Sequence, residues 1–183
     1  MIRPNVEALS LVTDFVPSPE DEKSRELILA LLEHTPTPFS RYQYHAGHIT
    51  CSALVLSPDS RRVLLMFHNR HQRWLLPGGH VEESDATLED TARRETLEET
   101  AVPTLPDGAA RLLGLDVHGI PARPRKGEPF HLHHDLIFVL RAGSDEFLVT
   151  EEAPRVAWCG IDELARHDVP ANIFRAASRL AVR

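Results

Sequence analysis

The order of strand-like and helix-like segments predicts an α/β protein, in which a mixed β-sheet is covered by helices on both faces. Two observations carry this prediction. Short runs of β-forming residues, bounded by turn residues, alternate with stretches of helical apolar spacing. A further helical segment precedes the first strand, so we expect residues 1–42 to form a helical N-terminal extension and residues 43–183 to form the main domain. At 183 residues, the chain is long enough for one domain to build its own core.

The N-terminal extension is predicted to be helical from about Pro19 to His34. Acidic residues fall in its first turn, leucines supply the apolar positions, and Pro36 and Pro38 end it. Polar residues interrupt residues 1–17, and no run approaches the roughly 18 apolar residues of a membrane span. We therefore expect an untargeted cytoplasmic protein.

The main domain begins with a predicted β-hairpin. Its strands are Ile49–Leu56 and Val63–Phe67, and residues 57–60 between them are turn formers. Pro77-Gly78-Gly79 is expected to break the chain before a long helix. The remaining predicted elements are a short strand at Trp74, strands at Ala110–His118, His131–Leu140 and Val156–Cys159, and one or two terminal helices.

The composition excludes several classes of function. The content of 42% hydrophobic and 26% charged residues is that of a soluble globular protein. A formal net charge of -7 disfavours non-specific binding to nucleic acid, and an acidic protein that handles phosphates needs metal ions between itself and them. Cys51 and Cys159 lie in apolar strand-like contexts, so we interpret both as small core residues of a protein in a reducing compartment.

The helix after the chain break, from about Thr87 to Thr100, carries a dense group of carboxylates. Glu95, Glu98 and Glu99 stand at positions i, i+3 and i+4, within about 100° of one helical face. Arg94 precedes Glu98 by four residues and offsets part of their repulsion. Such a face suits hard divalent cations, which prefer oxygen ligands, whereas a charge run alone is more often a solvated surface.

The order of residues around this helix resembles the Nudix box of the MutT-like hydrolases. That box reads Gly, five residues, Glu, seven residues, Arg-Glu, apolar, any, Glu-Glu, any, Gly, apolar. The matching residues are, in order, Gly79, Asp85, Arg94, Glu95, Glu98, Glu99 and Val102. One residue is inserted near the helix start, Thr96 takes an apolar position and Ala101 takes that of the final glycine. The resemblance runs from about His48 to Trp158 and implies a Nudix-type α/β/α sandwich.

The resemblance also implies a metal-dependent hydrolase that cleaves a diphosphate linkage in a nucleoside diphosphate linked to another group. The carboxylates of Glu95, Glu98 and Glu99, with the carbonyl of Gly79, would hold Mg²⁺ or Mn²⁺ ions, and Arg94 belongs to the same catalytic set. The base that activates water is left open. Glu95 or Glu99 could act through the ions, and Glu151 or Glu152 could come from a later loop.

Histidines form a second pattern. His131, His133 and Asp135 alternate along a predicted strand, so their side chains project to one face while His134 projects to the other. This run signals a metal or phosphate site, and a polar strand face lining a wet cleft is an equal alternative.

The isopentenyl diphosphate isomerases, which are relatives of the Nudix enzymes, hold a metal with histidines at similar places and with acidic residues on the equivalent late strand. The matching positions here are His48, His80, His133 and Asp135. This resemblance implies a transition-metal site separate from the carboxylate helix. Isomerase chemistry itself is opposed by Gly78, because those enzymes place an essential cysteine there.

The substrate is expected to be a small nucleotide, but no signature assigns it. Trp74 could stack on a base, although beside two leucines it is more often a core residue. His118 and His131 could be additional metal ligands or phosphate contacts. Arg123 could meet phosphates, and a solvated loop is the alternative for it. Two rival functions are a non-catalytic Nudix domain that senses a nucleotide and an isoprenoid diphosphate isomerase. We also expect a homodimer.

Overall fold

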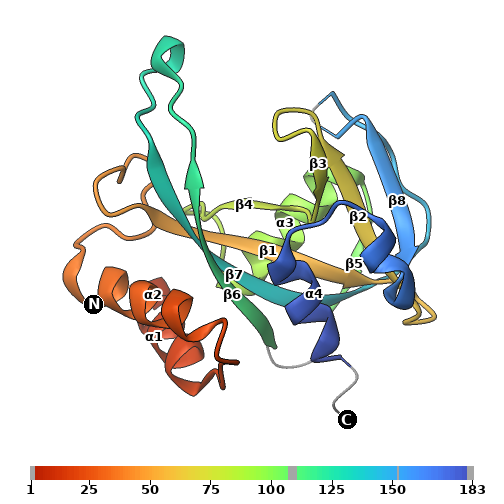
Figure 1. Ribbon diagram of the computed structural model, residues 1–183, viewed down its shortest axis with the longest axis horizontal. Helices are drawn as coiled ribbons and strands as arrows, with labels where there is room; N and C mark the ends of the chain where they lie inside the picture. The colour runs from red at the N-terminus through yellow and green to blue at the C-terminus, as the bar shows by residue number, and fades with distance from the viewer. Residues whose placement is uncertain (1–2, 107–110, 152, 181–183) are drawn as a thin grey trace.

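The computed structural model describes residues 3–106, 111–151 and 153–180, and it confirms the predicted mixed sheet between helices (Figure 1). The helices are α1 (Arg3–Asp14), α2 (Glu22–His34), α3 (Leu88–Thr100), α4 (Ala171–Ser178) and the short 3-10 turns η1 (Pro124–Lys126) and η2 (Ile161–Arg166). The strands are β1 (His48–Leu56), β2 (Arg62–His68), β3 (Arg73–Leu75), β4 (Gly78–His80), β5 (Thr104–Leu105), β6 (Leu112–Ile120), β7 (His131–Ala142) and β8 (Arg155–Gly160).

All the strands of this described part belong to one sheet. Its order is β3-β2-β1-β7-β5, with β4 beside β1, β6 beside β7 and β8 beside β2. The β1 and β7 strands run parallel in the middle of the sheet, and the other pairs are antiparallel. The expected hairpin is present, because Leu56 of β1 pairs with Val63 of β2. The predicted strand start at Ala110 lies outside the described residues.

The expectation of a chain break at Gly78 and Gly79 was wrong. Both residues belong to β4, which pairs with β1 through Gly78 beside Ser52 and His80 beside Thr50. A Cβ on Gly78 would lie 2.5 Å from the Ser52 Oγ and 2.7 Å from the Cys51 carbonyl oxygen. The glycine therefore lets β4 approach β1 more closely than a larger residue would.

Helices cover the sheet on two sides, as Figure 1 shows for α1 and α2 on one side and α4 on the other. One core joins α1, α2 and α3 to alternate residues of β1 and β7, such as Ile49, Cys51 and Phe138. The second core lies beneath α4 and includes Ile137. Because α1 and α2 contribute to the first core, the N-terminal extension packs directly on the sheet.

The described residues contain no helix that is long and apolar enough to cross a membrane. Cys51 and Cys159 are buried free thiols, as predicted.

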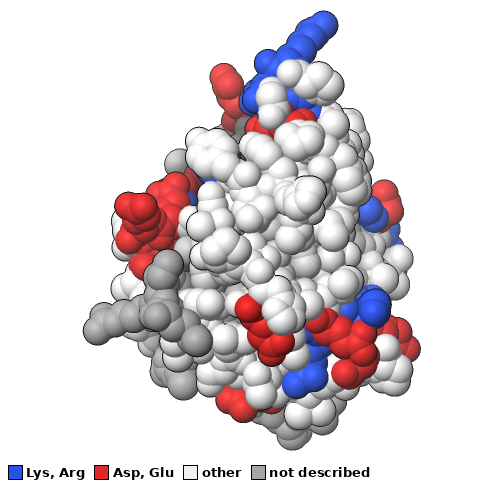
Figure 2. Space-filling view, turned by 90° about the vertical axis from the view of Figure 1, so that its left-hand side faces the viewer, with Lys and Arg blue, Asp and Glu red and all other residues white. Residues whose placement is uncertain are grey.

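The β6–β7 hairpin projects beyond the rest of the molecule (Figure 1). Its tip, η1, contains Arg125 and Lys126. Figure 2 shows basic side chains at the top of the molecule, above a broad surface with few charged residues.

Candidate functional site

The α3 helix begins at a capped end. The Thr87 side chain accepts a hydrogen bond from the Asp90 amide at 3.1 Å and donates one to the Asp90 carboxylate at 2.8 Å. The Leu88 amide donates to the Glu7 carboxylate of α1 at 3.1 Å. These acceptors satisfy amides that a helix start leaves without partners. The extension thus fixes the first turn of the carboxylate helix.

The Arg94 side chain reaches from α3 to the loop that precedes this helix. Its guanidinium donates to both carboxylate oxygens of Asp85 at 3.0 Å and to the carbonyl oxygen of His80 at 2.8 Å. It also contacts the carboxylates of Glu95 at 2.9 Å and Glu98 at 3.2 Å. Asp85 therefore pairs with the box arginine even though one residue is inserted after it. These bonds hold the β4–α3 loop against the helix.

The three glutamates lie along one side of α3 at different depths. The Glu95 carboxylate lies against β4, where a Cβ on Gly79 would come within 2.4 Å of it. Glu99 accepts a hydrogen bond from the Gly78 amide at 2.9 Å. The Glu98 side chain is 58% exposed. The group thus extends from the surface of β4 outward to solvent.

The electrostatics of this group suit a bound cation. Burial raises the pKa of Glu95, and the nearby charges of Glu98 and Glu82 raise it further against the opposing effect of Arg94. Burial works in the same direction on Asp85, but hydrogen bonds from Arg94 and Thr91 bring the pKa of Asp85 below its ordinary value. Crowded carboxylate oxygens with one partly desolvated member fit Mg²⁺ or Mn²⁺, which prefer oxygen donors.

Histidine rings gather at the start of β1 and β7. The parallel register places His48 beside His133, and His118 of β6 pairs with His133 from the other side. The centroid of the His48 ring lies 4.8 Å from that of His133 and 5.0 Å from that of His80. The His131 ring is 5.1 Å from His48. All five predicted histidines thus belong to one cluster, in which His80, His131 and His133 neighbour His48 and His118 neighbours His133.

The environment keeps His48, His80 and His133 neutral. Burial, together with smaller effects of the neighbouring imidazoles, lowers the pKa of His48 and of His80 to about 4. Burial and the same neighbours lower the pKa of His133 strongly. His118 differs, because its hydrogen bond to Asp116 at 2.9 Å and the nearby carboxylates raise its pKa against the effect of burial.

Asp135 and His134 follow the predicted strand alternation. The His134 ring turns to the opposite face and bonds the Ala46 carbonyl oxygen at 3.0 Å. Asp135 lies on the same face as His133, but its carboxylate accepts a hydrogen bond from the Thr50 hydroxyl at 2.9 Å. Burial raises the pKa of Asp135. The structure therefore brings His48, His80 and His133 into one group and joins Asp135 to Thr50 instead.

A comparison with models of known protein families identifies the family to which this fold belongs. A model described as the NUDIX domain matches residues 47–179. The chain belongs to the NUDIX family. The match begins just before β1, so it leaves α1 and α2 outside the NUDIX domain. No curated protein sequence matches the chain.

Solved structures support the same fold. A hydrolase of the NUDIX family from Clostridium perfringens is 20% identical, with a TM-score of 0.53, over 74% of this chain and 97% of that one. The NUDIX domain of Shewanella oneidensis NrtR, solved with ADP ribose, is 21% identical, with a TM-score of 0.54, over 82% and 96%. A C. elegans Ap4A hydrolase in a binary complex is 15% identical, with a TM-score of 0.51, over 74% and 98%. At these identities the likeness establishes the fold of the NUDIX domain.

The remaining predicted site residues occupy several places around this NUDIX fold. Trp74 packs edge-on against Phe67, with ring centroids 5.7 Å apart, and the Arg155 guanidinium lies 5.4 Å from its ring. Arg123 forms an ion pair with Glu128 in the β6–β7 hairpin. Trp74 is thus a half-buried packing residue, and its role in stacking on a base stays a prediction.

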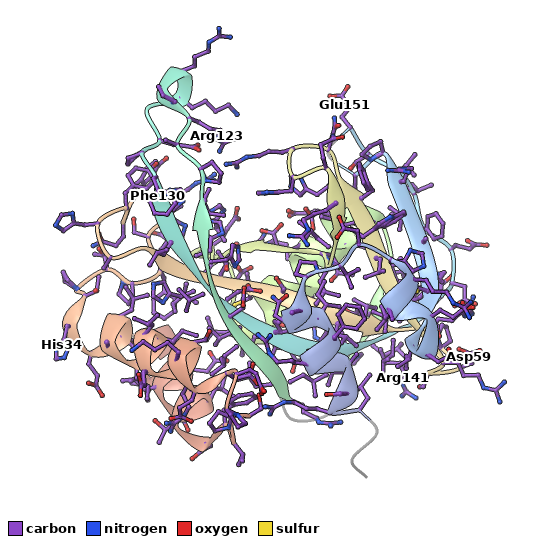
Figure 3. All side chains as sticks on the ribbon, in the orientation of Figure 1. His34, Asp59, Arg123, Phe130, Arg141 and Glu151 are labelled. Carbon is purple, nitrogen blue, oxygen red and sulfur yellow. The ribbon has the colours of Figure 1, made fainter. Side chains whose placement is uncertain are left out.

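The structure describes one of the two candidate bases in the later loop. Figure 3 shows Glu151 at the upper edge of the molecule, across from Arg123 on the hairpin. Glu151 lines an open hollow of about 390 Å³ together with His68, Asn69 and Arg70. Glu152 lies outside the described residues, so its candidacy as base stays a prediction.

Sequence reasoning did not select three residues that lie close to the histidines. Arg41, Tyr44 and Arg70 line a small cavity of about 40 Å³ whose other walls include His80, His131 and His133. The Tyr44 ring lies 5.0 Å from that of His131. Arg41 and Tyr44 come from the α2–β1 loop and Arg70 from the β2–β3 loop, and no spacing in the sequence connects them with the histidine positions. Only the fold brings them together.

Proposed function

We propose that this NUDIX protein is a pyrophosphohydrolase that needs Mg²⁺ or Mn²⁺ and cleaves the diphosphate linkage of a nucleoside diphosphate joined to another group. The observation that carries the proposal is the network around Arg94, which holds Glu95 beside Gly79 and leaves Glu98 exposed on the same side of α3. When bound there, such ions neutralise diphosphate oxygens and lower the pKa of water.

Residues of the chain supply the metal ligands, the positioning contacts and the base in this proposal. Glu95, Glu98 and Glu99 supply carboxylate oxygens as ligands, and the Gly79 carbonyl adds a fourth oxygen to the proposed set. Arg94 positions Glu95 and the loop through its bonds to Asp85 and His80. Glu95, Glu99, Glu151 and Glu152 remain the candidates for the base that accepts the proton of the attacking water.

The rival functions have less support. A sensor that lacks activity would be expected to lack box carboxylates, and Glu95, Glu98 and Glu99 are all present. The isomerases need a cysteine at the position of Gly78, where a Cβ would lie 2.5 Å from the Ser52 Oγ.

Because the Shewanella oneidensis NUDIX domain was solved with ADP ribose, we propose a substrate of that class, a small molecule built from a nucleotide. A cytoplasmic location and a homodimer stay predictions; light scattering of the purified protein tests the dimer.

A release assay tests the proposed function. The purified protein is screened against nucleoside diphosphate derivatives with Mg²⁺ or Mn²⁺, and the products are converted to free phosphate by an added phosphatase. We expect Glu98→Gln and Glu99→Gln to lose most metal-dependent hydrolysis while they keep the fold, because each loses a charge but keeps its volume. Glu33→Gln, on the exposed end of α2, is the matched control and should stay fully active. Full activity in both box variants would show that the ions are held elsewhere.

A further inference from the structure

Three imidazole side chains surround one point on the face of β4 opposite to Glu95. Gly79 faces Glu95, and His80 follows it directly, so strand alternation turns the His80 ring to the other face. One ring nitrogen from each of His48, His80 and His133 lies within 4.8 Å of the other two. This group is therefore separate from the carboxylates of α3.

The distances require only a small adjustment to hold an ion. Zinc bonds to imidazole nitrogen measure about 2.0–2.1 Å, so nitrogens at the corners of a tetrahedron lie about 3.4 Å apart. The sheet fixes the backbones, because His48 pairs with His133 and His80 pairs with Thr50 in the adjacent strand. The ring nitrogens therefore need to approach one another by at most about 1.4 Å to reach this spacing.

His48 carries the clearest sign of a ligand. Its residue is fully buried, and its Nδ1 lies 3.3 Å from the Gln43 carbonyl oxygen. A carbonyl only accepts hydrogen bonds, so Nδ1 is the protonated nitrogen and Nε2 keeps its lone pair. Among the residues that the structure describes, Nε2 has no hydrogen-bond partner. A buried acceptor without a partner costs free energy, and a histidine held through its other nitrogen is the usual arrangement of a metal ligand.

We propose that His48, His80 and His133 bind a divalent transition metal, such as Zn²⁺, independently of the ions at α3. Imidazole nitrogen suits zinc, iron, nickel or copper, whereas Mg²⁺ prefers oxygen. A cavity of about 40 Å³ adjoins His80 and His133 and leaves room for water as a fourth ligand. Asp135 lies outside this group, whose three members have ligand atoms within 4.8 Å of one another.

Cobalt binding tests this site without any substrate. Protein stripped with a chelator is titrated with Co²⁺, whose visible absorption reports nitrogen ligands and low coordination, and Zn²⁺ is then added as competitor. We expect one Co²⁺ per chain, displacement by Zn²⁺, and a higher Tm with Zn²⁺. His80→Gln and His133→Gln should weaken Co²⁺ binding more than tenfold, on the order of the effect of disturbing a metal site. His34→Gln is the control, since Figure 3 shows His34 pointing away from the body of the molecule.

The outcomes separate this proposal from the proposed function. A Glu98→Gln and Glu99→Gln double variant should keep the Co²⁺ spectrum although hydrolysis is lost. The proposal is overturned if wild-type protein gives no visible Co²⁺ absorption and no change in Tm, or if folded His80→Gln binds Co²⁺ like the wild type. His80→Gln decides this point if His133→Gln fails to fold. Hydrolysis without Co²⁺ binding would leave the proposed function intact.

Discussion

The guanidinium of Arg94 contacts both carboxylate oxygens of Asp85, each at 3.0 Å, although the two residues are nine positions apart. The Asp85 carboxylate also accepts a hydrogen bond from the Glu82 amide at 2.9 Å and one from the Thr91 hydroxyl at 2.8 Å. Asp85 thereby joins the loop after β4 to the first turns of α3. A bidentate ion pair of this kind fixes the relative orientation of the two side chains as well as the distance between them.

The first prediction is that Asp85→Asn lowers the rate of hydrolysis more than it lowers stability. Loss of the charge should let Arg94 turn away and shift Glu95 and the β4–α3 loop, and a displacement of about 1 Å near reacting groups costs roughly 100-fold in rate. The measurement is kcat and KM on the substrate found in the screen, together with a thermal melt. Asp85→Glu should recover part of the rate, and Glu83→Gln, an exposed neighbour, should leave it unchanged. Wild-type kcat in Asp85→Asn would contradict a positioning role.

The second prediction concerns Gly79. A methyl group at this position would lie within 2.4 to 2.8 Å of the Glu95 carboxylate atoms, so Gly79→Ala should displace Glu95 and remove most metal-dependent activity. A second variant separates crowding from other effects. If crowding is the cause, Gly79→Ala combined with Glu95→Ala should unfold at a higher temperature than Gly79→Ala alone. A lower melting temperature in the double variant would point to strain elsewhere in β4.

Part of this site follows from the sequence alone. The spacing of Glu95, Glu98 and Glu99 fixes a common helical face, and the alternation of His133 and Asp135 fixes a common strand face; both were confirmed. The sequence could not show that Thr50 lies next to Asp135, because this contact depends on the parallel register of β1 and β7. Helix propensity and strand alternation are local, whereas register is a tertiary property.

The pairing of β4 with β1 shows the same limit. Two glycines after a proline predict a loop from local rules, but in the fold they serve close packing of backbones. The contact between Glu7 and the start of α3 joins residues 81 positions apart, and no local pattern indicates it.

The third prediction is that Ala101→Gly stabilises the protein. Ala101 ends α3 with φ of 59°, in the left-handed region that favours glycine. Relief of this strain, less the greater entropy of glycine in the unfolded chain, should add about 0.5 to 1 kcal/mol to the free energy of unfolding. Urea unfolding measures the change. Ala101→Val should move the midpoint the opposite way, and equal midpoints for all three proteins would show that the helix end adapts without cost.

The last prediction concerns Glu7, which connects the N-terminal extension to the carboxylate helix. Its carboxylate accepts a hydrogen bond from the Leu88 amide at 3.1 Å, so Glu7→Ala should cost about 0.5 to 1.5 kcal/mol through the lost hydrogen bond.

The same residue should make stability depend on pH. Burial raises the pKa of Glu7, the Leu88 amide partly opposes this, and the charges of Asp90 and Glu89 add to the rise. A raised pKa in the folded state means that the folded protein binds the proton more tightly than the unfolded chain does. The stabilisation is therefore complete below the unfolded pKa of Glu7 and is lost as pH rises through the folded pKa. Glu7→Gln keeps an acceptor without the charge, so wild-type protein should gain stability relative to Glu7→Gln as pH falls from 7 through the raised pKa. Urea unfolding of both proteins at several pH values measures the difference, and a difference that stays constant with pH would show that Glu7 titrates alike in the folded and unfolded chains.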